Sequence, residues 1–163
     1  MAPWLILNKS IMAQITYSRF LDKVKEFEGF RPKPYHCPSG VLTIGYGHTH
    51  GVTSGMRIDE INAQKWLEYD LSVVAHQIMA LLPHFDDPYI YSEGLQFALI
   101  DFVFNVGIWK FRKSTLYNKF LKGVEKPNLQ SVEIELLKWT HSGSIVLKGL
   151  ERRRAWEVSL LYE

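Results

Sequence analysis

The sequence predicts an α+β fold with a small, β-containing N-terminal lobe and a mostly helical C-terminal lobe. Its 163 residues are 47% apolar and 22% charged, which is typical of a globular domain with a packed core. A β-rich run occupies residues 41–47, whereas apolar residues recur at helical spacing through most of the chain after Asp59. The strand signal is therefore confined to the first part of the chain.

The N-terminal residues begin with the apolar stretch APWLIL, which is too short to span a bilayer and lacks the features of a secretory signal. We expect residues 1–15 to be an extension of unknown role and residues 16–163 to form one domain. Within this domain we expect the small lobe at about 16–58 and the helical lobe at about 59–163.

A first helix is predicted to end at Glu28. From Ser18 onward, apolar residues recur at helical spacing, at Phe20, Leu21, Val24 and Phe27. Gly29 offers a left-handed cap, and Pro32 forbids continuation of the helix. Glu28 would then lie at the negative end of the helix dipole, which disfavours the charged form of its carboxyl group.

A small sheet or hairpin is predicted next. A turn at PSG (38–40) precedes VLTIGYG (41–47), in which Val41, Thr43 and Tyr46 suit strands. The turn-rich stretch GVTSG (51–55) follows.

The rest of the chain is predicted to be helical. Asp59 is a plausible N-cap for a long helix that Pro83 stops, and the mostly apolar residues 92–107 indicate a central buried helix. Further helical patterns lie at about 114–122, 131–139 and 149–161.

Charge, cysteine and histidine content indicate which partners and cofactors to expect. The net charge of +2 does not demand a nucleic-acid partner, and the basic run at 109–113 is most simply a solvated face. Cys37 is the only cysteine, so the chain cannot form an internal disulfide. The histidines show no metal-ligand spacing, and we expect neither a metal nor a cofactor.

Four motifs occur in order along the chain. Glu28 is followed by eight residues, Cys37, five residues and Thr43, and GYGHT (45–49) comes next. FVFNVGIWKFRKSTL spans residues 102–116, and GLERRRAWE spans residues 149–157. Together these motifs resemble those of phage-type lysozymes, glycoside hydrolase family 24, whose first pattern is Glu, usually Asp, and Thr. The family's stretch of Phe-Asn-x-Gly, an intervening loop and Ser-Thr-Leu is similar to residues 102–116.

The resemblance implies a lysozyme-like fold with the active-site cleft between the two lobes. It also implies hydrolysis of the β-1,4 bond between N-acetylmuramic acid and N-acetylglucosamine in bacterial peptidoglycan. Such hydrolysis needs an acid on the leaving oxygen and, in inverting enzymes, a group that activates water. We expect Glu28 to be the acid, and Cys37 and Thr43 to activate or position the water.

Cys37 departs from the family's usual aspartate and leaves three interpretations open. A thiolate could replace the carboxylate, although only a small fraction of an ordinary thiol is ionised at neutral pH. Cys37 could instead be a spectator while Glu28 acts alone, as in a lytic transglycosylase that forms a 1,6-anhydro product. The third interpretation is an inactive, peptidoglycan-binding module of lysozyme fold.

The resemblance also implies supporting residues. We expect His48 to form an ion pair with Asp70 rather than to take part in catalysis, and Arg153 is the best cationic candidate near Glu28. The positions that match residues lining the sugar cleft are Thr49, Phe104, Asn105 and Ser114. Phe104 could give an apolar face to a pyranose ring, and Asn105 could bond an acetamido group through its donor and its acceptor.

The expected partner is bacterial peptidoglycan, with no nucleic acid and no stable membrane insertion. We expect a monomer. The resemblance implies that the enzyme resides in the host cytoplasm and is released through a separate phage pore protein, and the lack of an evident signal peptide fits that route.

Overall fold

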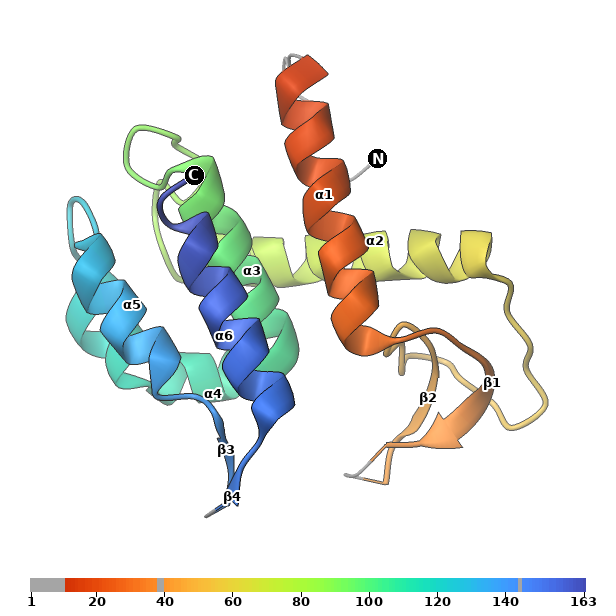
Figure 1. Cartoon of the computed structure of the whole chain (residues 1–163). Helices are drawn as coiled ribbons and strands as arrows, with labels where there is room; N and C mark the ends of the chain where they lie inside the picture. Colours follow the sequence, from red (N-terminus) through yellow and green to blue (C-terminus); the bar gives the residue numbers. More distant parts are fainter. Residues whose placement is uncertain (1–10, 38–39, 144) are drawn as a thin grey trace. The chain divides into compact units, whose positions relative to one another are not determined.

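The computed structural model describes residues 11–37, 40–143 and 145–163 (Figure 1). The chain divides into two compact units, Met1–Val73 and Val74–Glu163. Most of the expected N-terminal extension and two residues of the expected turn, Pro38 and Ser39, lie outside the described residues. The domain boundaries expected from the sequence stay predictions.

The first unit begins with helix α1, Ile11–Glu28. The helix ends at Glu28 as the sequence predicts, because Gly29 adopts a φ of 69°, a left-handed conformation that favours glycine. The backbone N–H of Gly29 donates to the carbonyl of Lys25 at 3.0 Å and so satisfies one of the last helical carbonyls.

The predicted hairpin follows directly. Strand β1, Arg31–His36, pairs antiparallel with strand β2, Leu42–Gly45. Tyr35 lies opposite Thr43 and His36 opposite Leu42, while the register is irregular between Arg31 and Tyr35. Cross-strand partners share a face of a sheet, so Tyr35 and Thr43 point to the same side of the hairpin.

Helix α2, Glu60–Met79, begins directly after Asp59, the N-cap that the sequence predicts. The backbone N–H of Asn62 donates to Asp59 Oδ1 at 2.8 Å, which is an N-cap interaction. The helix ends at Met79, before Pro83, and the boundary between the two units falls within it.

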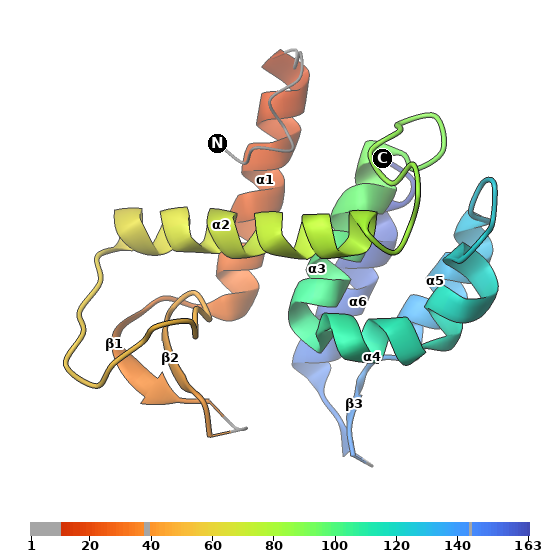
Figure 2. The ribbon, with the colours of Figure 1, turned by 180° about the vertical axis from the view of Figure 1, so that it is seen from behind.

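The core of the second unit is built around helix α3, Glu93–Val106. Ser92 caps this helix by accepting a bond from the N–H of Leu95, and residues 97–103 are all buried. Helix α6, Lys148–Leu160, packs against α3 and also against α5, Leu129–Leu137, and both views show the three helices side by side (Figures 1 and 2).

Gly94 permits the close contact between α3 and α6. A Cβ atom built at Gly94 would lie 1.8 Å from the carbonyl oxygen of Leu160, far inside any allowed separation. The contact therefore requires glycine for its lack of a side chain rather than for its backbone freedom.

The structure differs from the sequence prediction after α3. The expected loop within 102–116 contains a short helix, α4, Ile108–Lys113. The helix expected at 114–122 is a π-helix, η2, Leu116–Leu121. A hairpin of two short strands was not predicted. Its strands, β3, His141–Ser142, and β4, Ile145–Val146, have two residues each, which is too short to show a periodic signal.

Candidate active site

Glu28 is held between the end of α1 and a tight turn. The turn closes through paired backbone hydrogen bonds between Ile44 and His48, of 2.9 and 3.0 Å. Within it, Gly47 has a φ of 95°, and a Cβ there would lie 3.4 Å from Glu28 Oε2. The half-buried carboxyl group of Glu28 thus faces a turn that glycine keeps open.

The pKa of Tyr35 is influenced by the charged groups around Glu28. Burial is the main cause that raises the pKa of Tyr35, and the negative charges of Glu28 and Cys37 raise it further. The guanidinium of Arg31 lies 5.5 Å from the tyrosine ring and opposes this effect. Glu28 and Cys37 therefore act on one common neighbour on the hairpin.

Cys37 and Thr43 are both fixed by the backbone of the hairpin. The N–H of Cys37 donates to the carbonyl of Val41 at 3.0 Å, and the hydroxyl of Thr43 donates to the same carbonyl at 3.0 Å. Thr43 is only 3% exposed, whereas Cys37 is half-buried. Because its proton is already donated, the Thr43 hydroxyl can bind a water only by accepting from it.

His48 and Asp70 form the pair that the sequence predicts. His48 Nδ1 lies 2.7 Å from Asp70 Oδ2, and His48 Nε2 lies 2.9 Å from the carbonyl oxygen of His50. The imidazole ring also packs on Trp66, with 4.7 Å between ring centroids. Burial raises the pKa of Asp70, and the hydrogen bond and charge of His48 oppose that rise.

Thr49, the next residue along the turn, is exposed. The first unit thus brings together, around the end of α1 and the hairpin, five of the residues expected from the sequence: Glu28, Cys37, Thr43, His48 and Asp70. Thr49 directly follows His48 along the chain.

The remaining expected residues belong to the second unit. Phe104 and Asn105 are half-buried at the last turn of α3, where the helix emerges from the core. Asn105 Oδ1 accepts a hydrogen bond of 2.9 Å from Arg154 Nη2. Ser114 is buried, and its hydroxyl donates to the Phe111 carbonyl and accepts from the N–H of Tyr117.

Arg153 is paired with a buried acid that sequence reasoning did not single out. Its Nε and Nη2 donate to Asp101 Oδ2 and Oδ1 at 2.8 and 2.7 Å, a bidentate geometry. Asp101 is fully buried on α3. An aspartate within a long apolar run was the available signal, since a buried charge requires a partner.

Arg154 and Glu157 form a second buried pair on α6. Arg154 Nη2 donates to Glu157 Oε1 at 2.6 Å, and neither side chain is exposed. Burial, reinforced by the charge of Asp101, raises the pKa of Glu157 well above its usual range. Burial likewise lowers the pKa of Arg154, although Glu157 and Asp101 favour its charged form.

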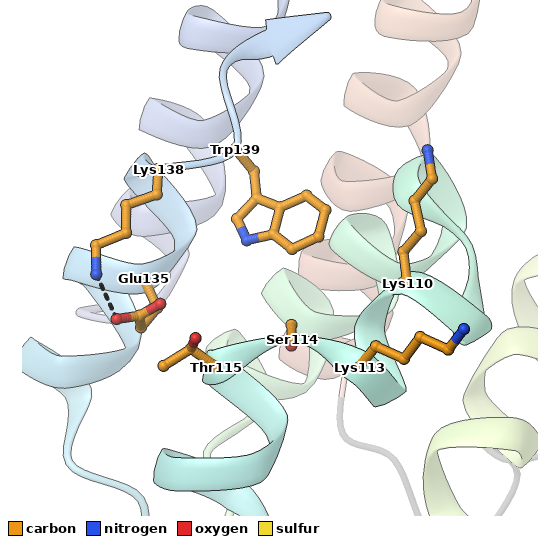
Figure 3. Close-up of a pocket in the computed structure, with 7 residues that line it drawn as sticks. All are labelled: Lys110, Lys113, Ser114, Thr115, Glu135, Lys138 and Trp139. Atoms are coloured by element: carbon orange, nitrogen blue, oxygen red, sulfur yellow. Dashed lines mark hydrogen bonds and ion pairs between the residues drawn. The ribbon is translucent and has the colours of Figure 1, made fainter. Parts of the chain in front are cut away.

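A pocket of about 480 Å³ lies beside Ser114 in the same unit (Figure 3). Trp139 projects into it, with Lys110 and Lys113 of α4 on one side and the hydrogen-bonded Glu135 and Lys138 on the other. Because three of the lining side chains are lysines against one glutamate, the pocket is suited to anionic groups.

Metal-binding clusters and membrane-spanning helices are both absent from the part of the chain that the structure describes. No three or more of its histidine, cysteine, aspartate or glutamate side chains are grouped so that they could bind a metal. None of its helices is long and apolar enough to cross a membrane.

Comparison with known proteins assigns the chain to a family. The family model described as phage lysozyme matches residues 25–157. A SAR-endolysin of Bacteriophage PS119 is 38% identical over 134 residues, which are 80% of this chain and 73% of the relative. An endolysin of Acyrthosiphon pisum secondary endosymbiont phage 1 is 32% identical over 141 residues, 84% of this chain and 90% of the relative.

Solved structures agree with this assignment. The muramidase domain of SpmX from Asticaccaulis excentricus superposes with a TM-score of 0.75 at 29% identity, covering 89% of this chain and 95% of that one. A mutant of P22 lysozyme gives a TM-score of 0.70 at 29% identity, covering 90% and 97%. The predicted α+β, lysozyme-like fold is therefore confirmed, and the chain belongs to the phage lysozyme family of glycoside hydrolases.

Proposed function

We propose that this enzyme hydrolyses the β-1,4 bond between N-acetylmuramic acid and N-acetylglucosamine in bacterial peptidoglycan, with Glu28 as the general acid. The observation that carries the proposal is the position of Glu28. It is the last residue of α1, and its carboxyl group faces the glycine turn next to the hairpin that bears Cys37 and Thr43. The family assignment and the solved muramidase domain support the substrate class.

Glu28 would protonate the glycosidic oxygen as the sugar–oxygen bond breaks. This step requires the carboxyl group to be protonated, and Glu28 lies at the C-terminal end of α1, the negative end of the helix dipole. In an inverting reaction a second group activates water on the opposite face of the ring.

We propose that Thr43 positions the attacking water and that Cys37 activates it. Thr43 Oγ1 would accept a hydrogen bond from the water, because its own proton is donated to the Val41 carbonyl. The Cys37 thiolate, in the place of the family's usual aspartate, would take the proton of the attacking water. Both side chains belong to the hairpin segment around Val41, which supports a shared role.

Candidate sugar-binding residues are present in both units. Thr49 is exposed on the turn after His48, and Phe104 and Asn105 emerge from the end of α3. The pocket next to Ser114 offers Trp139 and cationic side chains to a substrate whose stem peptides carry carboxylates.

Two ion pairs would hold the framework rather than react. His48 is bonded to Asp70 in the first unit, and Arg153 is bonded to Asp101 in the second. Each pair joins residues far apart along the chain, which suits a role in stabilising the unit that contains it.

Replacement of Glu28 by Gln tests the proposal. The glutamine variant keeps the shape of the side chain but cannot donate the proton, so release of glycan fragments should fall at least about 100-fold. Binding to purified peptidoglycan in a pull-down should persist. A Glu28→Gln variant that digests peptidoglycan at the parent rate would refute the assignment.

A lytic transglycosylase is the second candidate, favoured by the lack of a carboxylate at position 37. In that reaction the muramyl 6-hydroxyl attacks intramolecularly, so Glu28 alone would suffice. The ends of the released fragments separate the two reactions.

A further inference from the structure

We propose that Arg154 is a positioning residue that fixes the polarity of the Asn105 amide, so that Asn105 presents only N–H donors to the substrate and selects N-acetylated sugars. The inference deepens the proposed function and rests on it, since Asn105 is taken as a sugar-binding residue. It concerns contacts within the second unit alone.

Arginine has hydrogen-bond donors but no acceptor, which determines which atom of the Asn105 amide faces Arg154. A guanidinium carries five N–H donors and no acceptor, so the amide atom that it contacts must be oxygen. Arg154 Nη2 lies 2.9 Å from Asn105 Oδ1. The orientation of the Asn105 amide, which sequence alone leaves open, is therefore determined by its neighbour.

Arg154 is itself immobilised. It is fully buried on α6, its Nη2 also donates to Glu157 Oε1 at 2.6 Å, and its guanidinium lies 4.9 Å from the centroid of the Phe102 ring. A cation held by a carboxyl group on the same helix and by an aromatic face of α3 does not move freely. The helices that carry these residues lie side by side (Figure 1).

The amide nitrogen of Asn105 is left for a ligand. Among the residues that the structure describes it makes no hydrogen bond, and it is not one of the buried polar atoms that lack a partner. An amide nitrogen without a partner that is not among the buried atoms is accessible to solvent, as expected for a half-buried residue in the last turn of α3. Asn105 thus offers two N–H donors outward, while Arg154 occupies its oxygen.

This polarity has a consequence for specificity. The acetamido group has a carbonyl oxygen that can accept from Asn105, whereas the ammonium group of an N-deacetylated sugar carries donors only. Donor would then face donor, and the hydrogen bond would be lost. The enzyme should therefore cleave N-acetylated glycan in preference to deacetylated glycan.

The test compares kcat/KM on purified peptidoglycan with kcat/KM on the same preparation after N-deacetylation. We expect the parent enzyme to prefer the N-acetylated form about tenfold, and re-acetylation of the glycan should restore the rate. Because each ratio is measured within one variant, it does not depend on how much of that variant is folded.

Arg154→Met removes the donor that holds the amide, so the ratio should fall about three- to tenfold. Asn105→Asp removes the outward donors but keeps an acceptor for Arg154. Its ratio should fall further, because a carboxylate attracts the ammonium group. Arg152→Met is the matched control: Arg152 is the exposed neighbour on α6, and its removal should leave the ratio unchanged.

A parent enzyme without preference, or an unchanged ratio in either Arg154→Met or Asn105→Asp, would overturn the inference while leaving the proposed function intact. If Arg154→Met does not fold, Arg154→Gln replaces it, because an amide offers both a donor and an acceptor and no longer determines which Asn105 atom faces it. Its ratio should also fall, and an unchanged ratio would overturn the inference. If the parent releases no fragments from either glycan, the proposed function itself fails.

Discussion

Cys37 occupies the position at which the resemblance to phage-type lysozymes leads us to expect an aspartate. Its backbone is bonded to Val41, and the hydroxyl of Thr43 donates to the same carbonyl. If the thiolate takes the proton from water, the Cys37→Ser variant should lose most activity, because a serine hydroxyl is a far weaker base.

The Cys37→Asp variant should remain active, and alkylation of the thiol should inhibit the parent. Release of reducing sugar ends from peptidoglycan measures all three. Full activity in the serine variant would make Cys37 a spectator and would favour the reaction in which Glu28 acts alone.

His48 illustrates a residue to which we assign a structural role. Its imidazole bridges Asp70 and the His50 carbonyl and packs on Trp66. The His48→Asn variant should lose about 1–3 kcal/mol of unfolding free energy, because it leaves partly buried polar groups without partners. Thermal unfolding and turnover of the folded fraction measure the two effects separately. A variant that melts like the parent but lacks turnover would contradict this role.

Glu157 gives the fold a pH dependence with a defined sign. Its pKa in the folded protein lies well above the ordinary value of 4.5, mainly because of burial. Between that ordinary value and the raised pKa the folded state retains a proton that the unfolded state has lost. The contribution of Glu157 to stability is therefore fully present at low pH and decreases as pH rises.

The Glu157→Gln variant removes this titration. From about pH 4.5 upward, the stability of the parent relative to the variant should fall, by at most about 1.4 kcal/mol per pH unit. Urea unfolding of both proteins from about pH 4 to about pH 8 measures the difference. A difference that does not change with pH would show that Glu157 titrates normally.

At the scale of elements, residue patterns predicted the starts and ends that have a local cause. Asp59 caps α2, and Gly29 ends α1, as the sequence indicates. Helix α4 was missed because its six residues follow Gly107 and place Trp109 in solvent, where it is 70% exposed, so no apolar stripe is visible. A π-helix has no distinct sequence period to detect.

The close packing of α3 against α6 leads to a prediction about the stability of a Gly94 variant. A methyl group there would overlap the Leu160 carbonyl, and backbone cannot move aside as a flexible side chain can. The Gly94→Ala variant should lose at least about 2 kcal/mol of unfolding free energy, even though alanine favours helices. Gly149→Ala is the matched control, because Gly149 is also helical and an added methyl group there would meet no atom within 4 Å. Equal melting temperatures would contradict the close contact.

Helix α4 and the segment after it concentrate positive charge. Residues 108–126 contain six basic side chains and one acidic one, Glu125, although the net charge of the chain is only +2. Lys110 and Lys113 line the pocket beside Ser114. Replacing both by Gln should weaken binding to purified peptidoglycan several-fold and reduce its salt dependence, because the stem peptides carry carboxylates.

A double variant Lys65→Gln and Lys148→Gln makes the same change in charge at two lysines that do not line the pocket. Sedimentation with peptidoglycan at two salt concentrations measures both proteins. Equal loss of binding in the two double variants would assign the effect to net charge rather than to the pocket.

For the whole molecule, the order of four short motifs was enough to predict the family and the fold. The site was predicted only in part. The residues near Glu28 lie within one stretch of sequence, and the turn and hairpin that join them are local. The pairs of Arg153 with Asp101 and of Arg154 with Asn105 join residues about fifty positions apart. Spacing along the chain does not indicate which charges will be buried together.

The central claim is that Glu28 acts with a water-activating partner as a hydrolase. Mass analysis of the fragments released from purified peptidoglycan by the parent enzyme tests it most directly. We predict hydrated, reducible muramic acid ends. Fragments ending in 1,6-anhydro sugars would contradict the hydrolytic assignment, and the absence of fragments would contradict enzymatic activity altogether.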